Sequence, residues 1–452
     1  MIDWHVFEGC TSLKNVTIPE SVTQIGRYAF EGCTSLENIT IPESVTVVEE
    51  NAFKGCISLK SITIPKSVKI GSGVFINCSS LESIVVVEGN PEYDSREGCN
   101  AIIKTSTNSL LYGCKSTIIP ESVTQIGGNA FYGCASLKSI TIPKSVMKIG
   151  CGVFKNCTSL ESITIPDSVA MINWYAFEGC TSLKNITIPE SVTKIGNKAF
   201  KGCISLESIT IPKSVTQIET EVFSGCTSLV SITIPESVTK IEWGAFEGCT
   251  SLESITIPES VTVIEKNAFR GCTSLKSITI PKSVMKIGEG AFEYCASLKT
   301  VTISEGVTEI EEYAFRDCTA LESVTLPESG TSIQSVAFLG CTALESVTIP
   351  GGVKLAKGVY WGWVFERCDS LKEITFSKGI KRLSCGPDGG GLILKSLTTV
   401  NLPSGITTVH PGFFYNCPAL TTIFVPAGKI EYYKQRLPEE LHDKILELKN
   451  VE

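Results

Sequence analysis

The sequence is poor in the residues that catalytic and metal sites depend on. Only three of its 452 residues are histidines, namely His5, His410 and His442, and no two of them stand at a metal-ligand spacing. No Cys-x-x-Cys pair occurs either. Neither a nucleophile with its base and orienting group nor a ligand set can be recognised. We therefore predict that the chain is not an enzyme and has no cofactor and no metal.

Long apolar runs and basic stretches are also missing. No apolar run approaches the ~20 residues that a membrane-spanning helix needs. The formal net charge is −8, and Lys and Glu alternate along the chain without forming a basic stripe or a polybasic patch. We therefore predict no nucleic-acid partner, no small-molecule substrate and no membrane span in this chain.

What the sequence has in abundance is one repeated unit. A phenylalanine recurs every 23 residues from Phe131 to Phe338 without a slip. A fixed period of this size marks a solenoid, in which each coil buries its apolar face only against its neighbours. We count about 18 coils. Eight positions in a copy repeat as apolar or small residues and are predicted to point inward: Ala199, Phe200, Cys203, Leu206, Ile209, Ile211, Val215 and Ile218.

The pattern inside one coil predicts its local structure. Residues 206–211 alternate apolar and polar side chains, which indicates a short strand that Pro212 ends. Residues 215–218 are predicted to run extended along a second face. Residues 199–203 are predicted to form a 3₁₀ turn or one turn of α-helix.

Twenty cysteines would ordinarily suggest disulfides, but sixteen of them stand three residues after the landmark Phe, from Cys10 to Cys417. Stacked neighbours have parallel side chains, whereas a disulfide needs converging ones. We therefore predict a ladder of buried thiols that behave as small apolar groups. The sequence leaves open whether Cys99, Cys114, Cys151 or Cys385 form disulfides.

The consensus Leu-x-x-Ile-x-Ile-Pro-x-Ser-Val-x-x-Ile-x-x-x-Ala-Phe-x-x-Cys-x-Ser resembles the leucine-rich repeat of the BspA type. This resemblance covers nearly the whole chain. It implies a leucine-rich-repeat solenoid, a right-handed and β-rich α/β superhelix with short parallel strands. The family contains bacterial and some protozoan surface proteins, and its members include adhesins, some of which bind host matrix proteins such as fibronectin and fibrinogen.

Three stretches interrupt the repeat, near residues 88–119, 351–363 and 379–397. The first contains an Asn-Pro-x-Tyr-x-Ser element, which resembles a variant coil of the same family, and a predicted strand pair at 101–104 and 109–112. The second contains Tyr360, Trp361 and Trp363. The third has three consecutive glycines after Pro387 and Asp388, without a following Lys-Ser/Thr, which indicates a flexible loop and not a phosphate site.

The two ends of the chain differ in character. Residues 1–15 resemble residues 171–185, so the chain begins in mid-coil, and we expect a signal sequence to be missing upstream. Residues 429–452 carry apolar side chains at three- and four-residue steps, which predicts an amphipathic helix broken at Pro438. We therefore divide the chain into a solenoid of residues 1–428 and a C-terminal helical cap of residues 429–452.

Two exposed ladders are predicted on the strands. Lys and Glu alternate from coil to coil behind the strand Leu, which places opposite charges one strand apart. A threonine lies between the two inward residues of each strand, where structure alone explains a β-branched side chain. Solenoids nevertheless often bind partners on such a face. The candidate binding residues are Tyr360, Trp361, Trp363, Thr187, Thr210, Thr233, Thr256 and Thr279.

For the three aromatic residues the alternative is that their rings fold back beside Phe365 and fill the core. As to function, the first hypothesis is a protein-binding, adhesin-like module of a cell-surface or secreted protein, with a protein ligand such as a host extracellular-matrix protein. The alternatives are a repeat domain appended to a surface enzyme whose catalytic part lies outside this chain, and a structural spacer.

Overall fold

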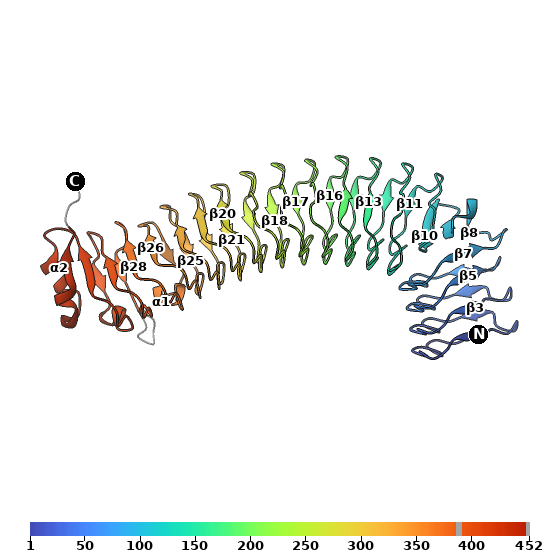
Figure 1. Ribbon diagram of the computed structural model, residues 1–452, viewed down its shortest axis with the longest axis horizontal. Helices are drawn as coiled ribbons and strands as arrows, with labels where there is room; N and C mark the ends of the chain where they lie inside the picture. Colours follow the sequence, from blue (N-terminus) through green and yellow to red (C-terminus); the bar gives the residue numbers. More distant parts are fainter. Residues whose placement is uncertain (386–390, 449–452) are drawn as a thin grey trace. The chain divides into compact units, whose positions relative to one another are not determined.

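The computed structural model describes residues 1–385 and 391–448. The chain divides into two compact units, Met1–Leu229 and Val230–Glu452, and each is a stack of coils whose short strands lie side by side (Figure 1). Strands of successive coils pair in parallel at the 23-residue offset, as in Ser277↔Thr300 and Thr300↔Ser323. The predicted solenoid is confirmed.

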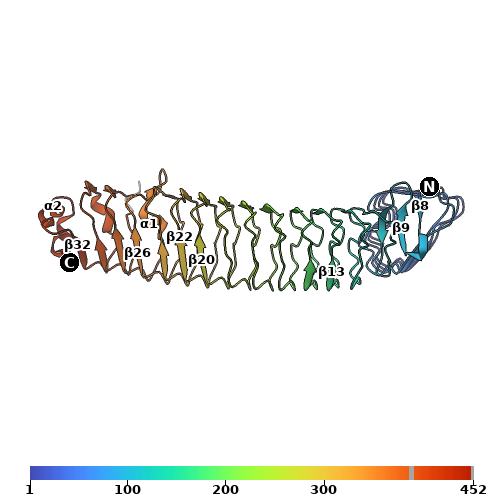
Figure 2. The ribbon, with the colours of Figure 1, turned by 90° about the horizontal axis from the view of Figure 1, so that it is seen from above.

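One side of each coil, which we call the strand face, is formed by the Leu-x-x-Ile-x-Ile segment (Figure 2). Its strands are β1 (Asn15–Thr17), β3 (Asn38–Thr40), β5 (Ser61–Ile64), β7 (Ser83–Val86), β13 (Ser162–Thr164), β15 (Asn185–Thr187), β20 (Ser277–Ile280), β22 (Thr300–Ile303), β24 (Ser323–Thr325), β26 (Ser346–Ile349), β28 (Glu373–Phe376), β30 (Thr399–Asn401) and β32 (Thr422–Val425).

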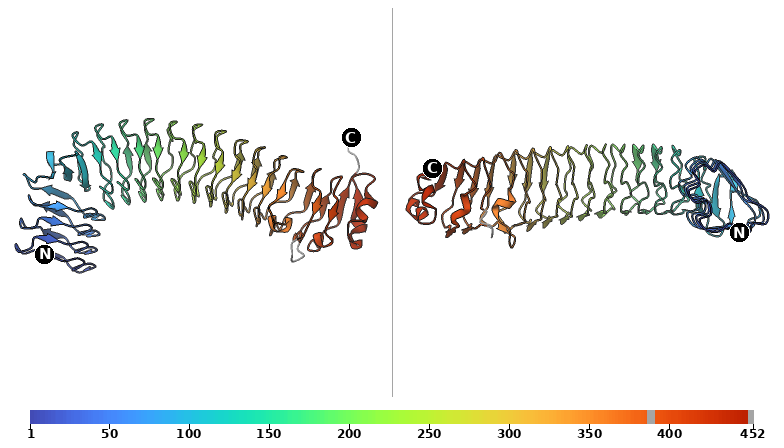
Figure 3. Two further views of the ribbon diagram at one scale, coloured as in Figure 1. Left: turned by 180° about the vertical axis from the view of Figure 1, so that it is seen from behind. Right: turned by 90° about the horizontal axis from the view of Figure 1, so that it is seen from below.

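The second face is formed by the Val-x-x-Ile segment, and its strands are shorter (Figure 3). They are β2 (Gln24–Ile25), β4 (Val47–Val48), β6 (Lys69–Ile70), β11 (Gln125–Ile126), β12 (Lys148–Ile149), β14 (Met171–Ile172), β16 (Lys194–Ile195), β17 (Gln217–Ile218), β18 (Lys240–Ile241), β19 (Val263–Ile264), β21 (Lys286–Ile287), β23 (Glu309–Ile310), β25 (Ser332–Ile333), β27 (Lys354–Leu355), β29 (Arg382–Leu383) and β31 (Thr408–Val409).

The core runs through each stack and consists of the eight predicted inward positions. In the coil around Phe200 all eight side chains are at most 6% exposed. The Phe rings stack from coil to coil, with centroids 5.2 Å apart for Phe269 and Phe292 and 5.3 Å apart for Phe292 and Phe315. Phe292 therefore contacts a ring of the coil before and a ring of the coil after.

The segment around each landmark Phe, which we call the Phe turn, differs from the prediction, because the regular coils have no 3₁₀ or α-helix there. Instead, consecutive tight turns are closed by backbone hydrogen bonds from a residue to the third residue before it. Lys201 N donates to Lys198 O, and Cys203 N donates to Phe200 O. Between them the chain takes positive φ twice, at Lys198 (59°) and Gly202 (71°). A left-handed residue cannot continue a right-handed helix, so a chain of tight turns results.

The thiol ladder is confirmed. Fifteen of the sixteen ladder cysteines are buried, the exception being Cys10, and all twenty cysteines are free. Most of these thiols also have a role that the sequence analysis did not predict, since they donate to the Phe carbonyl of the preceding coil. Cys180 Sγ lies 3.1 Å from Phe154 O, and Cys203 Sγ lies 3.2 Å from Phe177 O.

Residues 88–119 insert extra elements into the first unit. These are β8 (Tyr93–Asp94), η1 (Arg96–Gly98), β9 (Ala101–Lys104) and β10 (Ser109–Gly113). β9 and β10 pair antiparallel, as predicted, and β10 then pairs with β11. On the side of the Phe turns no coil is added, because Asn77 N donates directly to Tyr132 O at 3.0 Å. The insertion therefore adds residues to the stack on the side away from the Phe turns and none at the Phe turns themselves.

The C-terminal segment contains α2 (Ile430–Lys434), η3 (Glu439–Lys444) and β33 (Ile445–Glu447). The predicted second helical piece is wrong at its end, because residues 445–447 form a strand that pairs in parallel with β32. The edge of the sheet offers these residues backbone partners, which outweighs their helical periodicity. The division into residues 1–428 and 429–452 stays a prediction.

Candidate functional site

The predicted threonine ladder lies on the outer surface of the strand face. Thr187, Thr210, Thr233, Thr256 and Thr279 are all exposed. In most strands the second outward residue is Ser, so that two rows of hydroxyl groups follow each stack. The predicted charge ladder borders them, with Lys60 Nζ 2.9 Å from Glu37 Oε2 and Lys276 Nζ 2.6 Å from Glu253 Oε2. Lys60 lowers the pKa of Glu37 by its hydrogen bond.

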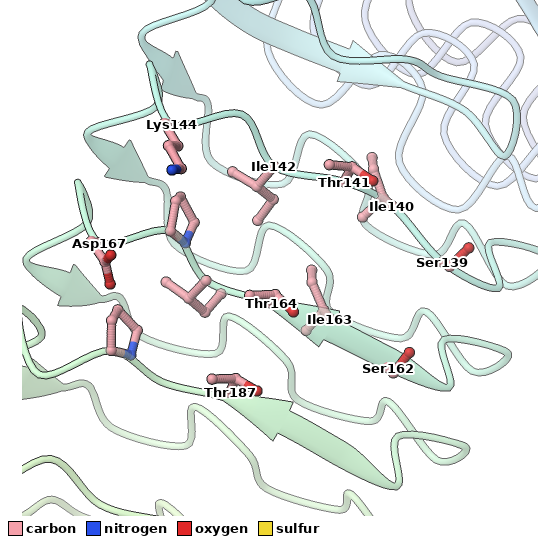
Figure 4. A pocket seen from close by; sticks show the side chains of 13 residues that line it. Ser139, Ile140, Thr141, Ile142, Lys144, Ser162, Ile163, Thr164, Asp167 and Thr187 are labelled. Carbon is pink, nitrogen blue, oxygen red and sulfur yellow. The ribbon is translucent and has the colours of Figure 1, made fainter.

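In the first unit, a groove of about 530 Å³ opens on this face beside residues 139–142 (Figure 4). Ile140, Ile142 and Ile163 line it between the rows of Thr141, Thr164 and Thr187, with Lys144 and Asp167 at one end and Ser139 and Ser162 at the other. Ile140 is partly exposed, whereas its counterpart Ile163 is 5% exposed. The groove therefore uncovers the side chain of Ile140, whose counterparts Ile163 and Ile209 are buried.

The backbone beside this groove is unpaired. Ile165 N donates to Thr187 O at 3.2 Å, but within the part of the chain that the structure describes its counterpart Ile142 N has no partner. Residues 139–142 form no strand, although their sequence matches the consensus. An extended segment with free donors and acceptors can receive an added strand from another polypeptide.

The insertion of residues 88–119 lies on the same face, before the coil that lines the groove. On the strand face, residues 95–101 lie between β7 and the next coil, because Val86 N donates to Ser95 Oγ at 2.9 Å and Ile118 N donates to Cys99 O at 3.1 Å. The Phe turns have no such addition, because Asn77 N donates directly to Tyr132 O. The sequence analysis missed this groove, and the only available signal was the irregular stretch 88–119.

The predicted aromatic residues lie around the short helix α1 (Trp361–Val364) in the second unit. Trp361 is 4% exposed, and its ring packs against Phe365 and Phe376 with centroids 6.5 Å and 5.7 Å away. Tyr360 and Trp363 are partly exposed and meet edge to face at 5.2 Å. Trp361 therefore fills the core beside Phe365, and only Tyr360 and Trp363 offer substantial surface to a partner.

Groups suited to metal binding are not gathered in one place in the described residues. Among residues 1–385 and 391–448, no three His, Cys, Asp or Glu side chains are placed to hold a metal ion. His410 accepts a bond from Gly412 N at the start of η2 (Pro411–Phe414), and His442 Nε2 lies 3.1 Å from Leu437 O. No helix within those residues is long and apolar enough to span a bilayer. The glycines predicted as a loop, 386–390, lie outside the described residues.

A family model described as "BspA type Leucine rich repeat region" matches residues 1–109, 104–226, 147–275, 193–322, 239–360, 285–387 and 391–437. None of the curated proteins matches this chain.

Solved structures with a similar chain include three bacterial leucine-rich-repeat proteins. A leucine rich cell surface protein from Faecalibacterium prausnitzii A2-165 is 28% identical, covering 80% of this chain and 88% of its own, with a TM-score of 0.45. A leucine-rich repeat protein from Bacteroides ovatus is 26% identical, with coverage of 96% and 92% and a TM-score of 0.47. One from Eubacterium ventriosum is 25% identical, with coverage of 80% and 84% and a TM-score of 0.48.

Proposed function

Since this chain belongs to the BspA-type leucine-rich repeat family, we propose that it is a non-enzymatic module that binds other proteins. It acts as an adhesin-like part of a cell-surface or secreted protein and engages host extracellular-matrix proteins or proteins of neighbouring cells. Its binding surface is the strand face, and the threonine rows with Thr187, Thr210, Thr233, Thr256 and Thr279 belong to it.

The observation that carries this proposal is the groove beside residues 139–142. Near-identical coils offer a repetitive surface, on which no single place is distinguished from the next. The groove is distinguished by its volume of about 530 Å³ and by the partly exposed side chain of Ile140 between the rows of hydroxyls. Apolar contacts would supply affinity there and backbone bonds would fix the register of an added strand.

The experiment is a binding measurement on the full chain by biolayer interferometry with immobilised fibronectin and fibrinogen. The variant Thr141→Glu with Thr164→Glu places two charges over the groove, and we expect it to bind at least tenfold more weakly. The matched control is Thr302→Glu with Thr325→Glu, which changes the same positions on β22 and β24, where the strands are paired. The control should bind like the unaltered chain.

Two results would contradict the proposal. The first is no binding of either matrix protein at micromolar concentration, which would favour the spacer or the enzyme-appended domain. The second is equal loss in both variants, which would move the binding surface away from the groove. All four threonines are exposed, so melting temperatures within a few degrees of the unaltered chain are expected and verify folding.

A further inference from the structure

A second groove, of about 490 Å³, lies in the other unit beside α1. It separates β27 from β29 on the second face. β27 pairs with β25 and β29 pairs with β31, but within residues 1–385 and 391–448 no backbone bond joins β27 to β29. Each of the two strands therefore presents one free edge to the groove.

The insertion that contains α1 uncovers part of the core here. Leu355 is aligned with Ile333 and Ile310 in the second-face ladder. Those two isoleucines are fully buried, whereas Leu355 is partly exposed. The groove is further lined by Val353, Ala356, Val359 and Ile380 and by the rings of Tyr360 and Trp361. Its floor is therefore apolar.

The charge of the groove has one sign. Lys354, Lys381 and Arg382 line it, all three are exposed, and no carboxylate is among the lining residues. Several cations elsewhere in the ladder are neutralised: Lys286, at the position of Lys354, lies 2.7 Å from Glu311, and Lys194 lies 2.9 Å from Glu219. In the described part of the chain, Lys354, Lys381 and Arg382 have no ion-pair partner. The groove therefore gathers three positive charges with no carboxylate among its lining residues, although the net charge of the chain is −8.

From these features we infer that the groove between β27 and β29 binds an acidic, extended segment of a partner protein. The free strand edges fit a peptide backbone, the apolar floor fits alternate side chains, and the three cations fit carboxylates on the others. A polysaccharide is disfavoured, because Tyr360 and Ser384 are the only uncharged side chains with a hydroxyl or amide group along this lining. This site goes beyond the proposed function and uses a different face and a different unit.

The test is fluorescence anisotropy with the full chain and a fluorescein-labelled ten-residue peptide of alternating glutamate and valine. We expect saturable binding that weakens as salt rises. Exchanging glutamate for glutamine in the peptide should weaken binding at least tenfold. The triple variant Lys354→Glu, Lys381→Glu, Arg382→Glu should also weaken it at least tenfold, and Tyr360→Ala should weaken it severalfold.

The matched control is the triple variant Lys184→Glu, Lys213→Glu, Lys282→Glu, which changes the net charge equally at exposed lysines of regular coils. It should bind the acidic peptide like the unaltered chain. The inference is overturned if the acidic peptide does not bind, if the glutamine peptide binds equally, or if both triple variants lose binding to the same extent. Binding of a heparin fragment without binding of the peptide would overturn it in favour of a polysaccharide. None of these outcomes bears on the matrix-protein experiment, which alters Thr141 and Thr164.

Discussion

Alkaline pH should unfold this protein through its thiol ladder. Burial raises the pKa of Cys56, Cys134, Cys180 and Cys295 from 9.0 to about 12. In the unfolded chain these thiols regain the ordinary value. Because the folded pKa is the higher one, the contribution of each thiol to stability is complete below pH 9. It is lost as the pH rises from 9 towards 12.

The magnitude follows from the size of the shift. Each buried thiol loses about 1.4 kcal/mol of stability per pH unit above 9, which is about 2 kcal/mol at pH 10.5. Nearly every regular coil carries one such thiol. Because these thiols are distributed along the one-dimensional stack, the loss of stability affects every part of the core at once.

The assay is urea unfolding at pH 8, 9, 10 and 10.5 in the presence of a reductant, followed by circular dichroism. The midpoint should be steady up to pH 9 and fall steeply above it. Cys180→Ala with Cys295→Ala should reduce the slope above pH 9, whereas Cys10→Ala, at an exposed position, should leave it unchanged. Tyrosines and lysines also titrate in this range but are the same in all three proteins. If the urea midpoint fell equally steeply above pH 9 in the unaltered chain and in both variants, the reasoning would be refuted.

Three further outcomes are expected. Phe292→Ala removes a fully buried ring stacked on both neighbours and should cost about 3–5 kcal/mol locally; hydrogen exchange should accelerate first in the adjacent coils, and uniform acceleration along the unit would contradict nearest-neighbour coupling. In folded protein, a thiol reagent should label Cys10 and Cys151 within minutes and leave Cys203 unlabelled, and rapid labelling of Cys203 would contradict a closed core. Trp361→Ala should lower the melting temperature by several degrees, because it leaves a cavity beside Phe376, whereas Trp363→Ala should lower it less; equal effects would contradict their different burial.

The repeat made most of the fold predictable. A 23-residue period with eight apolar positions determines which side chains point inward, and the structure buries all eight in the coil around Phe200. The Phe turn was not predictable in detail, because apolar spacing does not reveal backbone handedness. Gly202 suggests a positive φ. The residue type does not reveal it in every coil, however, because Tyr294 at the equivalent position also takes a positive φ, of 62°.

The candidate sites were harder to predict than the fold. The groove at residues 139–142 lies in a coil of regular sequence, so nothing in that coil's own pattern predicts it. The aromatic insertion is visible in the sequence, but its periodicity does not tell which ring turns inward; packing space beside Phe365 and Phe376 selects Trp361. Cations such as Lys354 look like ordinary ladder residues until their partners are seen to be missing.

The central claim is that the strand face is open to a partner at residues 139–142. Hydrogen exchange of the free full chain, followed by mass spectrometry, tests this at two equivalent amides. Ile165 N is bonded to Thr187 O, and Ile142 N has no partner among the described residues. We predict that the amide of Ile142 exchanges at least tenfold faster than that of Ile165. Equal protection of the two amides would mean that the ladder is closed at residues 139–142 and would contradict the account.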